Sequence, residues 1–442
     1  MKYFCRCFAI LILLLSARES NGEILRQSNG TPVRYAGNFS AKVINLPAAV
    51  IRTRQTRAVW VATVENIDFG PFVNAAQFRN EAAAMMRQIK RANFNTVFFQ
   101  VRSNCDAWYP SALNPYSRYL TGKEGRGIAG IDPLKILIDE AHRNQLEFHA
   151  WFNPYRVTGG TPLSKNAYLK TLAPNNFARQ NPGAVLCVPI GKNKNSLLLD
   201  PGNPAVRKHI VQSIMEVVSR YNIDAVHFDD YFYLYSDIRN ADAASFARYN
   251  YAGKSLANWR RDNVTTVIMA VHHNLKSFNR KYNRKVAFGI SPFGIWANKR
   301  TTPAGSLTGG KECYTTLYAD VRRWIKAGLI DYVVPQLYWG FNHSTAAYAC
   351  LADWWANQVR GTRVRLFTGH AIYRLGSSQE FPVNEIFNQL RYNQTRNEIT
   401  GFALFSYRRF FKPENNNMKR GVNLIKSMMR LPAQRVKYNI SR

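Results

Sequence analysis

The stretch AVHFDDYFY, residues 225–233, places a short apolar run directly before two adjacent carboxylates, Asp229 and Asp230. Successive side chains of a β-strand point to opposite faces, so His227 and Asp229 share one face while Phe228 lies on the other. The polar face therefore predicts a functional site at the end of a buried strand. Asp230 points away from that site if the strand stays regular, whereas a bulge at the strand end brings both carboxylates into it.

Seven further apolar runs predict strands of the same kind, and they alternate with amphipathic segments that predict helices. With 224–230, the predicted strands are 57–64, 94–102, 146–154, 285–293, 331–339, 365–373 and 401–407, and the clearest helical segments are 81–93, 132–145, 203–222 and 318–329. Eight strand–helix units predict an α/β fold, the (β/α)8 TIM barrel, with long loops on the catalytic face. A doubly wound open sheet is the alternative, disfavoured because no glycine-rich turn follows the first strand.

In such a barrel the functional groups lie at the C-terminal ends of the strands. Alternation along each strand turns a set of polar side chains inward. These are Gln100, Arg102, His149, Trp151, Asn153, His227, Asp229, Ser291, Gln336, Tyr338 and His370. A barrel interior without chemistry is usually filled by Val, Ile and Leu, so the set predicts a binding site, with a satisfied polar core as the alternative.

The loops after the strands add aromatic and polar side chains to the same face of the predicted barrel. We expect an aromatic rim on which sugars stack, and further polar contacts beside it. The rim is predicted from Trp108, Tyr109, Tyr155, Tyr231 and Tyr233, and the added substrate contacts are Asp106, Arg156 and Trp339. Local packing of these loop aromatics is the alternative interpretation.

The composition limits the partners of the protein. The chain has 442 residues, 46% of them hydrophobic, and a formal net charge of +33 that is spread along the sequence. This excess predicts a polyanionic neighbour, and charge alone does not choose among nucleic acid, anionic lipid, acidic glycan and a bacterial cell wall. No nucleic-acid-binding module is recognisable, so we expect a glycan polymer or an anionic envelope surface and no specific nucleic acid.

The N-terminus predicts export. Lys2 and Arg6 precede the apolar run FAILILLLSA, and polar residues follow it. This order predicts a secretory signal peptide over 1–22 and a location in the periplasm or cell envelope, without a transmembrane segment after cleavage; an uncleaved anchor is the alternative. The remaining chain is divided into a lead-in segment (23–56), the barrel domain (57–430) and a basic C-terminal tail (431–442).

Cofactor chemistry is not expected from the sequence. The four cysteines that follow the signal peptide, Cys105, Cys187, Cys313 and Cys350, lack the spacing of a zinc site and either form disulfides or stay free. Neither a G-x-G-x-x-G run nor a Walker loop is present. We therefore expect no metal and no cofactor.

Several stretches resemble one known family. They are RAVWVATVENIDFG, NTVFFQVRSNCDAWYPS, DPLKILIDEAHRNQLEFHAWFNPYRV, LLLDPGNPAVRKHI, DAVHFDDYFY, FGISPFGIW and LIDYVVPQLYW. In order and spacing, from about residue 57 to about 410, they are similar to the glycosyl-hydrolase-like family of bacterial envelope proteins, the DigH-like glycosidases. The resemblance implies a TIM-barrel glycosidase that cleaves peptidoglycan glycan strands already stripped of their stem peptides. A hydrolase of another polysaccharide and a non-catalytic glycan-binding barrel remain as alternatives.

Glycoside hydrolysis ordinarily needs two carboxyl groups, and the sequence offers one clear pair and three weaker candidates. Asp229 is expected to face the cleft, with Asp230 beside it. The other candidates for the second carboxylate are Glu65, Asp106 and Glu312, which lie in loops after the predicted strands.

A substrate-assisted mechanism needs only one protein acid. In it a 2-acetamido group on the sugar attacks the anomeric carbon. Gln336 and Tyr338 are placed to orient that group, and Arg102, Asn153 and Arg156 are expected to hold sugar hydroxyls, the acyl carbonyl or a lactyl carboxylate.

Overall fold

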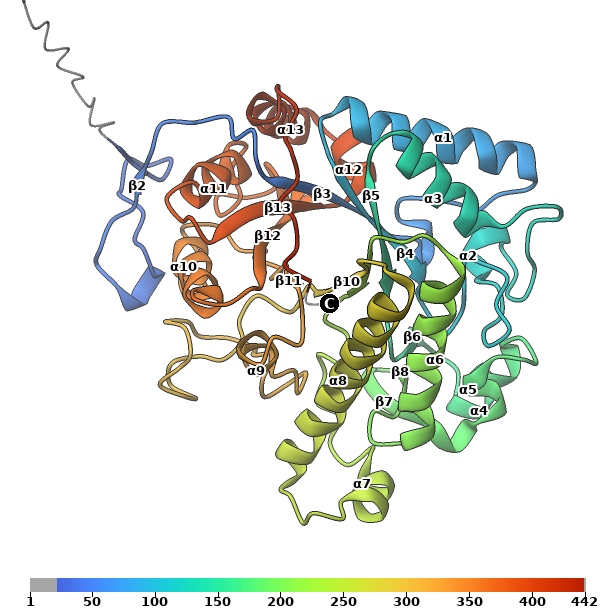
Figure 1. Ribbon diagram of the computed structural model, residues 1–442. Coiled ribbons are helices and arrows are strands. Elements are labelled where there is room, and N and C mark those ends of the chain that lie inside the picture. The colour runs from blue at the N-terminus through green and yellow to red at the C-terminus, as the bar shows by residue number, and fades with distance from the viewer. Residues whose placement is uncertain (1–21, 441–442) are drawn as a thin grey trace, which may run out of the picture.

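The computed structural model describes residues 22–440 and contains the predicted barrel (Figure 1). Eight parallel strands close on themselves in the order β10–β11–β12–β13–β3–β4–β5–β9. All eight predicted strands are present, as β3 (Thr56–Val61), β4 (Thr96–Arg102), β5 (Glu147–Phe152), β9 (Ala225–Phe228), β10 (Ala287–Ile290), β11 (Tyr332–Val333), β12 (Arg365–Ala371) and β13 (Ile399–Phe405). The TIM-barrel prediction is confirmed.

Helices surround the barrel and follow its strands (Figure 1). They are α1 (Ala75–Arg91), α2 (Arg118–Thr121), α3 (Pro133–Arg143), α4 (Lys165–Thr171), α5 (Phe177–Gln180), α6 (Pro204–Arg220), α7 (Ala243–Tyr249), α8 (Leu256–Tyr282), α9 (Val321–Lys326), α10 (Tyr348–Val359), α11 (Glu385–Asn393), α12 (Tyr407–Phe411) and α13 (Asn416–Met428). The N-cap side chains of Asn74, Asp132 and Asn203 accept backbone N–H groups at the starts of α1, α3 and α6. Such caps satisfy donors that have no partner within the helix, which explains where these helices begin.

The barrel interior combines large aromatic side chains with very small ones. Trp60, Phe98 and Tyr332 fill it, and a Cβ atom on Gly289 would lie 2.0 Å from the Tyr332 ring. Glycine at that inward position therefore makes room for the tyrosine, in keeping with interiors packed at near-crystalline density.

A three-stranded antiparallel sheet, absent from the sequence prediction, is inserted between β5 and α6. It has the order β6–β8–β7 and consists of β6 (Arg156–Thr161), β7 (Val185–Gly191) and β8 (Lys194–Leu199). In Figure 1 this sheet lies beside α6 and α8, outside the barrel strands. Because it follows the C-terminal end of β5, it adds a wall to the face where TIM barrels place their sites.

The N-terminal segment of the described chain forms a small hairpin of β1 (Glu23–Ile24) and β2 (Asn45–Leu46). It lies beside α11 (Figure 1), where the Arg391 side chain donates to the carbonyl of Pro47. The predicted signal peptide, residues 1–22, lies outside the described residues except for Gly22. No helix within residues 22–440 is long and apolar enough to cross a membrane.

The C-terminal segment is not a free tail over its described residues, up to Ile440. It runs from α13 to the middle of the barrel (Figure 1). The Gln434 N–H donates to the carbonyl of Thr53, Arg435 pairs with Glu147 at the start of β5, and the Tyr438 ring stacks on Tyr332 with 5.2 Å between centroids. The segment thus covers the end of the barrel opposite the strand C-termini.

The four cysteines of the described chain, Cys105, Cys187, Cys313 and Cys350, are free thiols. Three of them are buried, so they act as small apolar side chains in the packing.

Candidate active site

Asp229 and Asp230 of the AVHFDDYFY stretch lie just beyond the end of β9. The strand stops at Phe228, so the alternation rule no longer governs Asp229 and Asp230. Both side chains are buried, with 3% and 1% of their surfaces exposed. Burial raises the pKa of the Tyr338 hydroxyl on the neighbouring wall, and the charges of both aspartates raise it further. The expectation that Asp230 points away is therefore wrong, and the alternative arrangement, with both carboxyls at the cleft, describes the structure.

Asp229 is held by three donors. Its Oδ2 accepts from the Trp151 Nε1 at 3.1 Å and the Asn153 Nδ2 at 3.0 Å, and its Oδ1 accepts from the Tyr231 backbone N–H at 3.3 Å. Trp151 and Asn153 lie at the end of β5, so two neighbouring strands determine the position of this carboxyl group. Donors of this kind stabilise the ionised form.

Asp230 has fewer partners. The Tyr235 hydroxyl donates to its Oδ2. Its Oδ1 is buried without a hydrogen-bond partner among residues 22–440. A buried carboxyl oxygen without a donor disfavours a negative charge, so this environment favours the protonated acid.

The pKa values of the two carboxyls are pushed apart. Burial raises the pKa of Asp229 to about 6, against the opposing effects of Arg156 and its three donors. Burial and the neighbouring Asp229 charge raise the pKa of Asp230 to about 8. At neutral pH the pair therefore holds one ionised and one protonated group, which is the division that acid catalysis beside a charged carboxylate requires.

Arg156 at the start of β6 lies next to this pair. Its guanidinium carbon is 4.7 Å from the centre of the Tyr231 ring, and its Nε donates to the carbonyl of Ser103 at 3.1 Å. Its backbone N–H donates to the Asn153 side chain at 3.1 Å. The three-stranded sheet therefore brings a cation to the edge of the cleft, where the sequence prediction placed it.

The loop after β11, which is the sixth barrel strand along the chain, forms the other wall of the cleft. The Gln336 Nε2 donates to the carbonyl of Ser291 at 3.0 Å. Gln336 also partly offsets the rise that burial causes in the pKa of Asp230. Tyr338 and Trp339 are partly exposed, and the Trp339 ring packs edge-on against Phe293 with 5.3 Å between centroids. These residues lie where a sugar bound at the aspartates would contact them.

The aromatic rim differs from the prediction. Tyr231, Tyr338 and Trp339 are partly exposed, together with Tyr235 and Tyr373, which the sequence analysis missed. The sequence signal that could have identified Tyr235 is its place in the same loop as Tyr231 and Tyr233. For Tyr373 that signal is its place at the end of the predicted strand 365–373. Four predicted rim residues are instead fully buried, namely Trp108, Tyr109, Tyr155 and Tyr233. The loops fold back over the helices and bury them; the Tyr109 hydroxyl, for example, donates to the Ser213 carbonyl of α6.

The two polar side chains of β4 have structural roles in place of the expected contacts with a ligand. A bulge between Gln100 and Arg102 places Arg102 opposite Phe152, on the outward face of β5. Arg102 is buried there and donates to the carbonyls of Asn153 and Pro154. Gln100 remains inward, but its Oε1 accepts the backbone N–H of Thr63 at 3.0 Å and so ties β3 to β4.

His149 and His227 face inward, but they lie inside the barrel, away from the cleft at the C-terminal ends of the strands. The Trp60 Nε1 donates to the His227 Nε2 at 3.2 Å, and the Tyr332 hydroxyl bridges the two Nδ1 atoms at 3.0 Å from His227 and 2.8 Å from His149. The His149 Nε2 then faces Glu147 at 3.5 Å. These histidines belong to a buried chain that runs toward the C-terminal segment, not to the substrate-binding surface.

His370 points out of the barrel, against the prediction. Its Nδ1 bonds to Gln389 of α11 at 2.7 Å, and its ring stacks on Tyr348 of α10. The inward position of β12 belongs to Gly369, because a Cβ atom there would already lie 3.1 Å from the Trp60 ring. Large packing partners in the interior thus decided the register of this strand.

The three remaining candidates for the second carboxylate do not join the pair. Asp106 accepts the backbone N–H groups of Ser103 and Asn104, both at 2.9 Å, and so shapes its own loop. Glu312 accepts from Asn298 and from Thr301 and Thr315 within the loop after β10. Glu65 is exposed on the loop after β3, and no described contact joins it to the aspartates.

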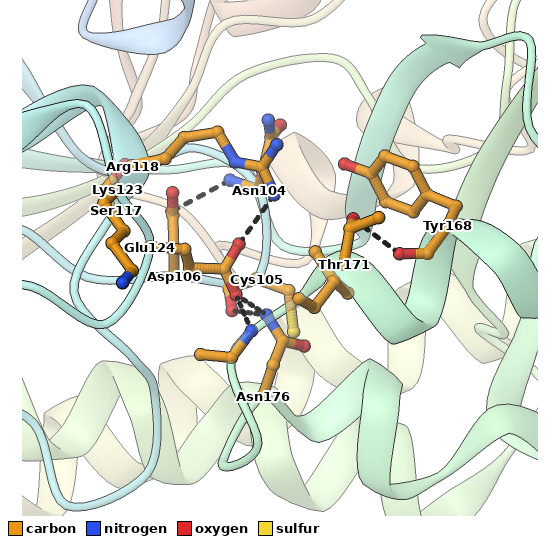
Figure 2. A network of polar contacts seen from close by, with 12 residues as sticks. Asn104, Cys105, Asp106, Ser117, Arg118, Lys123, Glu124, Tyr168, Thr171 and Asn176 are labelled. Carbon is orange, nitrogen blue, oxygen red and sulfur yellow. Dashed lines mark hydrogen bonds and ion pairs between the residues drawn. The ribbon is translucent and has the colours of Figure 1, made fainter.

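Figure 2 shows how the loop that carries Asp106 is fastened to the insertion after β5. The Glu124 carboxylate pairs with Arg118 at 2.9 Å and accepts from the Asn176 side chain at 2.9 Å. Asn176 also donates to the carbonyl of Cys105 at 3.2 Å. This network is structural and steadies one side of the cleft. Another buried acid, Asp68, accepts from Ala62, Ser406 and Arg408 and likewise joins loops.

No group of three or more His, Cys, Asp or Glu side chains is placed to hold a metal ion within residues 22–440. The end of β9 brings together two carboxyls with the cation Arg156 nearby.

Comparison with known proteins gives consistent matches. The family model described as Glycosyl hydrolase-like 10 matches residues 55–384. Glycosyl hydrolase YngK of Bacillus subtilis is 39% identical over 377 residues, 82% of this chain and 71% of that protein. Glycosyl hydrolase DigH of Escherichia coli K12 is 38% identical over 390 residues, 83% of this chain and 87% of that protein. Among solved structures, the catalytic domain of β-amylase from Paenibacillus polymyxa matches with a TM-score of 0.49 and 12% identity, over 86% of this chain and 99% of that one.

The class of this protein follows from its closed parallel barrel, the carboxyl pair at the strand C-termini and the identity to these relatives: it is a TIM-barrel glycoside hydrolase. More narrowly, the chain belongs to the glycosyl hydrolase-like 10 family.

Proposed function

We propose that this hydrolase cleaves peptidoglycan glycan strands stripped of their stem peptides, using Asp230 as the proton donor and the 2-acetamido group of the substrate as the nucleophile. The observation that carries the mechanism is that, among residues 22–440, Asp229 and Asp230 form the carboxyl pair at the end of β9, with pKa values of about 6 and 8. The other candidate carboxylates are engaged in loops or lie outside it.

In the proposed first step Asp230 gives its proton to the glycosidic oxygen as the bond to the anomeric carbon breaks. The acetamido carbonyl oxygen forms a bond to that carbon from the opposite face, and the leaving sugar departs as an alcohol. Asp229, ionised and held by Trp151 and Asn153, accepts the amide N–H and stabilises the positive charge that develops on the ring. Water, deprotonated by Asp230, then opens the cyclic intermediate and regenerates the acetamido group.

The peptidoglycan assignment is supported by the HAWFNPYRV and HFDDYFY motifs and by the net charge of +33, which suits a polyanionic wall. The predicted signal peptide supports a periplasmic or envelope location. Sequencing of the mature N-terminus checks that location, and we expect a chain that begins at Glu23. A chain that retains Met1 and fractionates with the cytoplasm would contradict it.

The substrate is tested with purified glycan strands from which an amidase has removed the stem peptides. We expect mass spectrometry to detect shortened strands and NMR to show retention of anomeric configuration, because two displacements occur at the same carbon. An inverted product would exclude the acetamido nucleophile. Binding without any product release would leave a non-catalytic glycan-binding barrel, and cleavage of unrelated polysaccharides alone would contradict the substrate.

A further inference from the structure

A groove of about 170 Å³ lies beside the aspartates, between the three-stranded sheet and the loop after β9. One wall contains Arg156, Ile190 and Leu198 of the sheet, and the other is the loop segment 231–236. Tyr231 and Tyr235 of that loop contact Asp229 and Asp230 respectively. The loop that forms this wall of the groove therefore also contacts both aspartates.

The free end of Arg156 is the feature of this groove that points to a ligand. Its Nε is bonded to Ser103 and its planar face covers Tyr231. Within residues 22–440 the hydrogen bonds that Arg156 donates come from its backbone N–H and its Nε, which leaves both terminal nitrogens of the guanidinium without a partner. A guanidinium fixed through Nε and ring stacking presents its remaining donors in one plane, which is the geometry that binds a carboxylate with two bonds.

Charges and apolar surface around the groove add to this picture. Lys311 at the Tyr235 end donates to the Tyr235 carbonyl at 2.7 Å. Lys194 packs against Gly160, next to the groove. Ile190 and Leu198 supply apolar wall between the cations. A ligand with a carboxylate and a small apolar group fits such a surface better than a neutral sugar does.

We propose that the groove is a subsite for a sugar residue that carries a carboxylate on a short substituent, bound through the terminal nitrogens of Arg156. The inference rests on the proposed function and adds the recognition element to it. The groove is smaller than the roughly 300–1,000 Å³ of pockets that enclose drug-sized ligands. Its size suits the short acidic substituent of a sugar.

The test uses one preparation of peptide-free glycan strands in two forms, untreated and with the carboxylates chemically reduced to alcohols. For the wild-type protein we expect kcat/KM on the untreated strands to be at least tenfold higher. In Arg156→Gln the ratio should fall to near one, because loss of the carboxylate contact affects the untreated strands alone, whereas loss of the charge beside Asp229 affects both forms equally. Arg156→Lys should restore only part of the preference, since an ammonium group lacks the planar pair of donors.

Lys419→Gln on the exposed face of α13 is the matched control, because it removes one positive charge remote from the groove, and the ratio should stay within about twofold of wild type. Circular dichroism and thermal unfolding confirm that each variant is folded. Equal wild-type rates on the two strand forms, or equal losses on both in Arg156→Gln, would overturn the subsite.

Binding separates this inference from the proposed function. The Asp230→Asn variant is titrated with both strand forms by calorimetry, so no cleavage is needed. Tighter binding of the untreated strands that disappears with Arg156→Gln supports the subsite even if the wild type cleaves neither form. Equal binding of the two forms refutes the subsite even if both are cleaved.

Discussion

The two ends of the barrel both contain buried polar side chains, but they treat them differently. At the closed end, donors and acceptors form a chain: Trp60 donates to His227, and the Tyr332 hydroxyl joins His227 to His149. Because Trp Nε1–H is only a donor, His227 Nε2 must accept, so its Nδ1–H donates to Tyr332, which in turn donates to His149. The direction of every bond follows from one tryptophan.

At the open end the polar groups are left incomplete. Asp230 Oδ1 has no partner within the described chain, the carboxyl pKa values are raised, and the end of Arg156 is free. At the closed end burial instead lowers the pKa of His227. Within the described chain the closed end also has buried atoms without a hydrogen-bond partner, such as the His149 Nε2, so the two ends differ in the raised carboxyl pKa values and the free guanidinium of the open end. The following variants test that difference.

The largest effect is expected for Asp230→Asn at the open end. The amide keeps the shape but cannot supply the proton, so kcat on peptide-free strands should fall about 10³-fold or more, which corresponds to about 4 kcal/mol of transition-state stabilisation. Turnover measured by product mass spectrometry checks this.

The same variant has a built-in folding control. The raised pKa of Asp230 means that the folded state holds a proton that the unfolded chain releases, so wild-type stability is lost as pH rises from about 4 to about 8. Asp230→Asn should therefore gain thermal stability relative to wild type across that range. Full activity in a folded Asp230→Asn variant would remove Asp230 from the mechanism.

The second expectation concerns the pH profile of kcat/KM. Ionised Asp229 and protonated Asp230 coexist between their pKa values of about 6 and 8, so activity should be bell-shaped with its maximum in that window. Below it the rate should fall about tenfold per pH unit, or about 100-fold near pH 4. In Asp229→Asn the acidic limb should disappear; an unchanged acidic limb would assign it to another group.

A smaller effect, on stability alone, is expected at the closed end. Tyr332→Phe leaves the Nδ1 atoms of His149 and His227 without their shared partner. Unfolding in urea should show a loss of about 1–3 kcal/mol. At a temperature where the variant is folded, kcat on glycan strands should stay within about twofold of wild type. A large loss of kcat would show that the two ends are coupled, contrary to the comparison.

The smallest effect is expected for Arg435→Ala in the C-terminal segment. Its ion pair with Glu147 joins the segment to β5, but 46% of the Arg435 side chain is exposed. Solvent screening limits such a pair to about 0–1 kcal/mol, and the loss should shrink further in high salt. Thermal unfolding at two salt concentrations measures it, and a loss well above this range would mean that the segment is a major support of the barrel.

The sequence alone determined the architecture of the barrel. Eight apolar runs separated by amphipathic segments specify strands and helices through local periodicity, and all eight strands are found in the predicted order. It also identified the end of β9 as the place where carboxylates gather, because Asp229 and Asp230 directly follow an apolar strand.

Tertiary structure decided which side chains reach the cleft. A bulge turned Arg102 outward, the end of β9 released Asp230 from alternation, and the space needed by Trp60 placed Gly369 inward and His370 outward. Loop aromatics such as Trp108 were buried by neighbours distant in sequence. Periodicity describes one strand at a time, whereas bulges, strand ends and interior packing depend on partners that meet only when the barrel closes. For the same reason the groove at Arg156 was not visible in the sequence, since its two walls come from separate segments, within 155–198 and at 231–236, and local pattern does not encode the contact between them.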